Sequence, residues 1–169
     1  LFSFNGGFSV AAGRGGASDV TSVDIAAPAI TAAEEHWRMN GLGQSHTGVV
    51  EDCFDYLERA KGRGECWDLV ICDPPSFAPN EKTRDRALAA YARLAQLAAS
   101  VTTEGGLLAL ASCSSHVDAS AFTQANLEGI GRARRQASWL LDRGLPVDHP
   151  TPMAMPELRY LKFQLLRVT

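Results

Sequence analysis

The order of apolar and polar positions along the chain predicts an alternation of helices and strands. Segments with apolar residues at helical spacing are separated by shorter apolar runs, with Gly, Pro and Asp at the junctions. The predicted helices are Phe8–Gly13, Pro28–Asn40, Phe54–Lys61, a segment from about Lys82 to about Val101, and Ala119 to about Arg134. The predicted strands are Leu1–Phe4, Asp19–Ile25, Gly48–Glu51, Trp67–Cys72, Leu107–Ala111, Ser138–Leu141 and Tyr160–Val168.

This order of elements predicts an α/β fold. Strands separated by helices form a doubly wound, Rossmann-like sheet that is mostly parallel. Leu1–Phe4 is expected to be the tail of a truncated first strand, and the apolar run Trp67–Cys72 is expected to be buried on both faces. A turn is expected at Glu104–Gly106. The last two strands are joined by a proline-rich connection, which predicts an antiparallel C-terminal hairpin.

Length and composition indicate one soluble domain. The 169 residues are 46% hydrophobic and 21% charged, which is ordinary globular usage and excludes a disordered or fibrous chain. No apolar run reaches the roughly 18 to 20 residues that cross a bilayer. Since the net charge is −3, RNA binding would need a local basic patch or a companion domain. The basic cluster Arg132, Arg134 and Arg135 is better explained as a solvated helix face.

The start of the chain and its cysteines predict a piece of a cytoplasmic protein. The chain begins at Leu1 without an initiator Met or a signal peptide, which suggests a part of something longer. The four cysteines are Cys53, Cys66, Cys72 and Cys113, and their spacing contains no Cys-x-x-Cys pair. A reducing cytosol and no metal site are therefore expected.

Candidate ligand groups fall at the ends of the predicted strands, where ligands bind in such sheets. Gly6 and Gly7 follow the first strand and leave the backbone open to close approach. Asp24 ends the next strand and is placed to accept hydrogen bonds from ribose hydroxyls, or else to cap the following helix. Asp52 is placed to bind an adenine amino group or to cap its own helix. Together they indicate a bound adenosine, and the absence of a Gly-x-Gly-x-x-Gly pattern favours S-adenosylmethionine over NAD.

A second candidate group follows the strand Trp67–Cys72. The segment Asp73-Pro74-Pro75-Ser76-Phe77 holds a carboxylate rigidly, and its aromatic ring is available to stack on a planar base. A simple strand terminator is the alternative for the two prolines. Cys113 ends the next strand and is a candidate nucleophile, although a lone cysteine is more often buried apolar filler. The helix from about Ala119 is a candidate source of the positive field that activates a thiol.

These motifs resemble those of class I S-adenosylmethionine-dependent methyltransferases, and more closely the bacterial large-subunit ribosomal RNA (cytosine-5) methyltransferase I family. The matching stretches, in chain order, are Leu1–Ser9, Val23–Ile25, Asn40-Gly41, Asp73–Phe77, Ser112–Ser114, Asp148–Pro150 and Tyr160–Lys162. The resemblance implies a methyltransferase catalytic domain over residues 1–169. It also implies a longer protein that carries an N-terminal PUA-like RNA-binding domain.

The resemblance implies a role for each residue of these motifs. S-adenosylmethionine, with S-adenosylhomocysteine as the product, would be bound by Phe4, Asn5, Gly6, Gly7, Phe8, Asp24, Ile25, Asp52, Cys53 and Asp73. The target base would be bound by Pro74, Pro75, Ser76 and Phe77. Asp73 would contact the target cytosine and Cys113 would attack its C6, which activates C5 for methylation. The base must leave its stack to reach these groups.

The expected partner is 23S ribosomal RNA, before or during subunit assembly, and the oligomeric state is left open, with a homodimer as one alternative. One departure from the pattern is Ser76, which stands where other RNA cytosine-5 methyltransferases carry a second cysteine. Methylation of a base nitrogen is the main rival function, because it uses the Asp73 motif and needs no cysteine. A NAD-dependent oxidoreductase and a non-catalytic RNA-binding module are weaker rivals.

Overall fold

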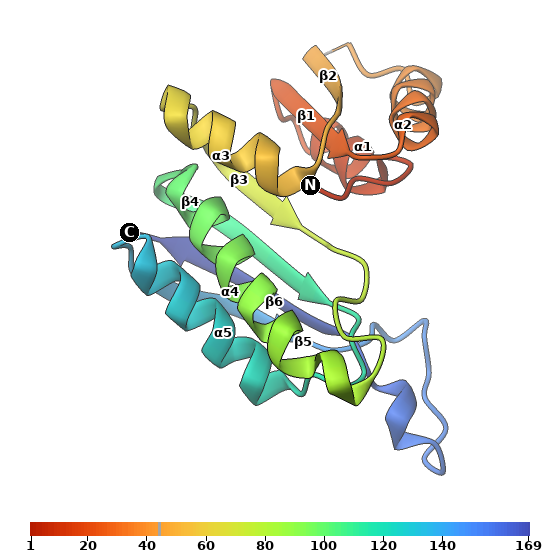
Figure 1. The fold of residues 1–169 in the computed structure, drawn as a ribbon. Coiled ribbons are helices and arrows are strands. Elements are labelled where there is room, and N and C mark those ends of the chain that lie inside the picture. Colours follow the sequence, from red (N-terminus) through yellow and green to blue (C-terminus); the bar gives the residue numbers. More distant parts are fainter. Residues whose placement is uncertain (44) are drawn as a thin grey trace. The chain divides into compact units, whose positions relative to one another are not determined.

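The computed structural model describes residues 1–43 and 45–169, and the chain divides into two compact units (Figure 1). One unit is Leu1–Arg59 and the other is Ala60–Thr169, so the division falls within the helix α3 (Cys53–Arg63). Each unit has its own paired strands and its own packed helices.

The first unit is built around a pair of parallel strands. Its elements are α1 (Gly7–Arg14), β1 (Asp19–Asp24), α2 (Ala27–Met39), β2 (Ser45–Val50) and the first part of α3. The apolar face of α2 buries Ala33 and Trp37, and the Trp37 ring stacks on His46 of β2 with 4.6 Å between ring centroids. Parallel pairing places the carboxyl ends of both strands, at Asp24 and Val50, at one edge.

The second unit is a four-stranded sheet with two long helices. Its elements are β3 (Trp67–Cys72), the short 3-10 helix η1 (Glu81–Thr83), α4 (Arg84–Ser100), β4 (Thr102–Ser112), α5 (Ala119–Arg132), β5 (Ala137–Arg143), η2 (Pro156–Leu158) and β6 (Lys162–Val168). The strand order is β3-β4-β6-β5, with β3 parallel to β4, and β6 antiparallel to both β4 and β5. Figure 1 shows α4 and α5 side by side along one face of this sheet.

The two long helices approach each other closely because α5 has a glycine at the contact. Tyr91 of α4 and Phe122 of α5 are both buried, and their rings meet edge to face at 5.2 Å between centroids. At Gly129 a Cβ atom would lie 2.1 Å from the Ala92 carbonyl oxygen and 2.9 Å from the Ala95 Cβ. The backbone of α5 therefore sits directly against α4, and no side chain fits between them.

The predicted fold class is confirmed. The chain alternates helices with strands, the pairs β1–β2 and β3–β4 are parallel, and β5 with β6 forms the predicted antiparallel C-terminal hairpin. The predicted helices and strands are all found except one, with ends that shift by a few residues.

The exception is Leu1–Phe4, which does not form the tail of a strand. Ser3 donates a backbone hydrogen bond to the Val23 carbonyl of β1 at 3.0 Å. The backbone is not extended on either side of this bond, because φ is 56° at Phe2 and 45° at Phe4. Residues with positive φ cannot continue a strand, so the prediction was wrong for this segment.

β4 is longer than predicted, because the residues expected to form a turn lie in a β-bulge within the strand. Glu104–Gly106 lies inside β4 rather than before it. The register between β3 and β4 jumps from the pair Trp67–Thr102 to the pair Leu69–Leu107, so extra residues of β4 bulge out of the ladder. The glycines predicted a turn, and the sheet uses them in the bulge instead.

β3 is buried at only one end. Val70 and Cys72 are buried, whereas Asp68 and Leu69 are exposed. β3 lies at an edge of its four-stranded sheet, and the amino-terminal half of the strand is exposed. The prediction of burial on both faces was wrong for this half.

The contact at Gly129 predicts the effect of adding one methyl group to α5. We expect Gly129→Ala to lower the free energy of unfolding by about 1 to 3 kcal/mol, because the new Cβ overlaps the α4 backbone. Gly131→Ala is the matched control in the same helix, since its Cβ would meet nothing within 4 Å. Urea unfolding followed by circular dichroism measures both. Equal stability of the two variants would contradict the proposed packing.

Candidate functional site

In the first unit, the end of β1 brings Asp24 to the loop before α1. One carboxylate oxygen of Asp24 accepts a hydrogen bond from the Phe4 N–H at 3.0 Å, and the other accepts one from the Ala26 N–H at 2.9 Å. Each oxygen has further lone pairs that can accept from a ligand. The large apolar side chains of Phe4, Phe8 and Ile25 are exposed nearby in the chain, with 70%, 47% and 70% of their surface accessible. A hydrogen-bond acceptor therefore lies at the carboxyl end of β1, with exposed apolar side chains close to it in the chain.

Gly6 and Gly7 are glycine for different reasons. Gly6 has φ of 79°, and a Cβ there would lie 2.7 Å from the Ala33 Cβ, so the fold itself requires this glycine. At Gly7 a Cβ would meet only the Asn5 side chain at 4.0 Å, so the fold leaves this position open. Among the described residues no side chain caps the start of α1, and its first N–H groups can receive an acceptor group. His36 holds the Asn5 carbonyl through its Nδ1 at 2.8 Å.

Asp52 and Cys53 have structural roles in this unit. One carboxylate oxygen of Asp52 accepts hydrogen bonds from the Phe54 N–H at 2.8 Å and the Asp55 N–H at 3.3 Å, so Asp52 caps α3, which was the alternative role. The buried Cys53 sulfur accepts from the Phe2 N–H at 3.1 Å. Burial raises the pKa of the Cys53 thiol to about 11, so this thiol stays protonated at neutral pH. Their contact with adenine stays a prediction.

In the second unit, the parallel pairing of β3 with β4 brings Asp73 and Cys113 to the same edge of the sheet. Cys72 at the end of β3 pairs with Leu110 of β4, so the segments that follow the two strands leave the sheet together. The Cys113 thiol donates a weak hydrogen bond to the Pro74 carbonyl, with 3.9 Å between sulfur and oxygen. The predicted nucleophile thus contacts the predicted base-binding segment.

The residues of the Asp73–Phe77 segment differ in their exposure to solvent. Pro74 is buried, Asp73 and Phe77 are half-buried, and Pro75 and Ser76 are exposed. Burial raises the pKa of the Asp73 carboxyl above its ordinary value. A carboxyl that keeps its proton more readily is suited to donate a hydrogen bond to a ring nitrogen.

A polar centre that the sequence analysis missed joins the two segments. The buried Ser114 hydroxyl lies 3.0 Å from the Ser76 hydroxyl and 2.8 Å from the Tyr91 hydroxyl, and it accepts a hydrogen bond from the Ala78 N–H at 3.3 Å. The Phe77 ring packs on the Tyr91 ring at 4.9 Å between centroids. Nothing in the sequence distinguishes this serine from its neighbours except its place after Cys113.

The cation beside the nucleophile segment is Lys162, which the sequence analysis included in a matching stretch without a role. Its Nζ donates to the Ser114 carbonyl at 2.6 Å and to the Val117 carbonyl at 2.7 Å. The helix α5, which was the candidate source of a positive field, is capped by the Asp118 carboxylate at the Ala121 N–H (2.8 Å). This negative charge offsets the helix dipole at its start.

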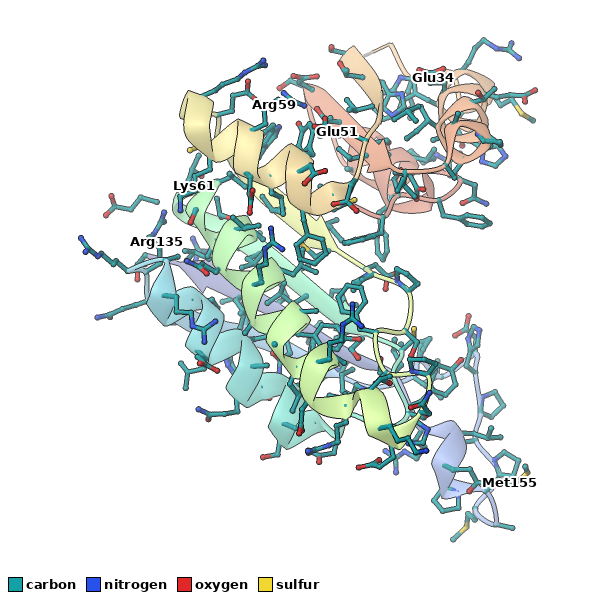
Figure 2. All side chains as sticks on the ribbon, viewed as in Figure 1. Glu34, Glu51, Arg59, Lys61, Arg135 and Met155 are labelled. Carbon is teal, nitrogen blue, oxygen red and sulfur yellow. The ribbon has the colours of Figure 1, made fainter. Side chains whose placement is uncertain are left out.

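The basic cluster Arg132, Arg134 and Arg135 lies at the carboxyl end of α5. Arg132 pairs with Glu128 at 2.6 Å. Arg135, which is labelled in Figure 2, donates to the Thr102 carbonyl at 3.0 Å and to the Thr103 carbonyl at 3.3 Å. Two of the three arginines are therefore engaged within the unit.

Among residues 1–43 and 45–169, no group of three or more His, Cys, Asp or Glu side chains is arranged to hold a metal ion. Within the same residues, no helix combines the length and the apolar character that crossing a membrane requires.

The chain is similar to known proteins along nearly its whole length. A family model described as S-adenosylmethionine-dependent methyltransferase matches residues 1–128. The ribosomal RNA large subunit methyltransferase of Deinococcus radiodurans is 43% identical over 99% of this chain and 41% of its own length. The ribosomal RNA large subunit methyltransferase I of Photobacterium profundum is 35% identical over 95% of this chain and 41% of its own length. The chain thus spans about 41% of these relatives.

A solved structure shows the same fold. A methyltransferase crystallised with S-adenosylhomocysteine superposes on this chain with a TM-score of 0.86 at 31% identity. The match covers 99% of this chain and 43% of that chain.

The burial of the four thiols predicts their reactivity in the folded chain. We expect iodoacetamide at neutral pH to label Cys66, which is exposed, and Cys113, which is partly exposed. Cys53 and Cys72 are buried and are expected to react only after unfolding, Cys53 also because of its raised pKa. Peptide mass spectrometry of native and unfolded samples measures the four rates. Labelling of Cys53 in the native sample as fast as Cys66 would contradict the structure.

Proposed function

This chain belongs to the S-adenosylmethionine-dependent methyltransferase family, and we propose that it is the catalytic part of an enzyme that forms 5-methylcytosine in large-subunit ribosomal RNA. The observation that carries the proposal is the contact of the Cys113 thiol with the Asp73–Phe77 segment. The printed names of the relatives support large-subunit ribosomal RNA as the substrate. Because the chain spans about 41% of those relatives, we assign RNA docking to an N-terminal PUA-like domain in a longer protein.

The first unit supplies residues that fit the cofactor. The free lone pairs of Asp24 would accept hydrogen bonds from the ribose hydroxyls, and the exposed Phe4 and Ile25 would contact the apolar parts of the molecule. The open position at Gly7 and the uncapped start of α1 suit its carboxylate. When bound, S-adenosylmethionine supplies a methyl group from its sulfonium centre.

The second unit supplies the groups that activate cytosine. The Cys113 thiolate would form a bond to C6, and the electron pair displaced from the C5–C6 double bond makes C5 nucleophilic. The Asp73 carboxyl would donate a hydrogen bond to N3, which stabilises the charge that moves into the ring. Once C5 carries its methyl group, a base removes the C5 proton. The C5–C6 double bond then re-forms, and Cys113 leaves as thiolate.

Release of the product in this proposal uses a single thiol. Ser76 stands where related RNA cytosine-5 enzymes carry a second cysteine, and its hydroxyl lies 3.0 Å from the Ser114 hydroxyl. A serine in that place supports the segment and is a poor nucleophile at its ordinary pKa. Loss of the C5 proton would therefore be sufficient to expel Cys113.

The proposed nucleophile is tested in the longer protein with labelled S-adenosylmethionine and protein-free large-subunit ribosomal RNA. We expect Cys113→Ala to lower methyl transfer at least about a hundredfold, because the C6 adduct cannot form. Cys66→Ala is the matched control, since this exposed thiol lies outside the proposed machinery. Mass spectrometry of the nucleosides identifies the product. A methylated purine, or full activity of Cys113→Ala, would establish base-nitrogen methylation instead.

The cofactor site is tested with the chain alone. We expect Asp24→Asn to weaken binding of S-adenosylhomocysteine at least about tenfold, because an amide has one acceptor oxygen where the carboxylate has two. Asp19→Asn, at the other end of β1, is the control and should bind normally. Isothermal titration calorimetry gives both affinities, and thermal melting shows whether each variant is folded. Unchanged affinity of a folded Asp24→Asn would remove Asp24 from the site.

A further inference from the structure

Lys162 is a buried cation at the start of β6, directly across the sheet from the nucleophile segment. In the antiparallel register of β4 and β6 it lies opposite Ser112, the residue before Cys113. The residue is 7% exposed, and its Nζ donates to the Ser114 and Val117 carbonyls at 2.6 Å and 2.7 Å. These two hydrogen bonds hold both ends of the turn Ser114–Val117, which follows Cys113.

The bonds of Lys162 reach the Asp73 segment through one residue. Ser114 accepts from Lys162 at its carbonyl, and its hydroxyl contacts Ser76 at 3.0 Å. A shift of the ammonium group would therefore disturb the segments that carry both Asp73 and Cys113. An ammonium group has three N–H donors, so one remains beyond the two carbonyls.

The positive charge of Lys162 lies beside the segment that carries the thiol. Burial lowers the pKa of Lys162 below its ordinary value, and a negative charge on Cys113 or Asp118 opposes that change. The ammonium is hydrogen-bonded to the carbonyl of Ser114, the residue after Cys113, and a positive charge beside a thiol favours its thiolate form.

The other charged groups of this turn have partners outside it. Asp118 lies 3.7 Å from the Arg84 guanidinium, and His116 lies 3.3 Å from the Glu81 carboxylate. All four of these side chains are at least one-third exposed, so solvent screens them more than it screens Lys162. Among the charged groups described around this turn, Lys162 is buried, whereas these four side chains are partly or largely exposed.

We propose that Lys162 is a positioning residue for Cys113: it holds the turn at Ser114–Val117 and stabilises the thiolate. The proposal deepens the function proposed above, since it rests on Cys113 as the nucleophile. Its test uses the reactivity of the thiol rather than methyl transfer, so the two proposals can fail separately.

The first experiment compares alkylation of Cys113 by iodoacetamide over a range of pH in three variants. Lys162→Met removes the charge, Lys162→Arg keeps it, and Lys61→Met changes an exposed lysine of α3 (Figure 2). In Lys162→Met we expect the rate at Cys113 near neutral pH to fall about tenfold and the profile to move to higher pH. Lys162→Arg and Lys61→Met should keep the normal profile. Cys66 in the same samples is the internal reference.

An unchanged Cys113 profile in a folded Lys162→Met, shown by circular dichroism, overturns the proposal. A second measurement leaves Lys162 in place, in case the methionine variant does not fold. The chain has three lysines, so the side-chain carbon next to each ammonium gives a resolvable NMR signal after isotope labelling. In Cys113→Ala the Lys162 signal should titrate at lower pH than in the unsubstituted chain. Identical titration in the two proteins overturns the proposal as well.

Discussion

The parallel pairing of β3 and β4 is the constraint on which the chemistry proposed for the second unit depends. Because Cys72 lies opposite Leu110, the two strands finish at the same edge of the sheet, and Asp73 and Cys113 follow within a few residues. Parallel strands need a helical crossover between them, and α4 provides it. The crossover through α4 thus connects the two strands whose ends carry a carboxyl and a thiol.

At this edge of the sheet, side chains that pack in the core also hydrogen-bond to the segment that carries Cys113. Tyr91 packs in the core against Phe122, while its hydroxyl contacts the Ser114 and Ser112 hydroxyls at 2.8 Å and 2.9 Å. A buried lysine is costly unless its N–H groups are bonded, and the carbonyls of Ser114 and Val117 meet that need for Lys162. A connected polar set of this kind holds one arrangement, because loss of any member leaves another unsatisfied.

In the first unit, some residues of the predicted cofactor site are required by the fold itself, and others are not. Gly6 is required by its positive φ and its contact with Ala33, and Asp52 caps α3. These residues would be needed without any ligand. Gly7 and the exposed Ile25 have no such role among the described residues, so the fold leaves both positions open for the ligand contacts that we propose. Asp24 does both, because its bonds to two N–H groups leave lone pairs free.

The sequence by itself determined the order of helices and strands, the antiparallel hairpin, and the strand-end positions of Asp24, Asp73 and Cys113. These features follow from periodicity and turn residues, which act within a few positions of the chain. Local signals misled where longer-range pairing decided the outcome: Leu1–Phe4 is not a strand, and β4 continues through its glycines as a bulge. Only the tertiary structure placed Lys162 on the carbonyl of Ser114, 48 residues away, because strand register depends on packing between distant segments.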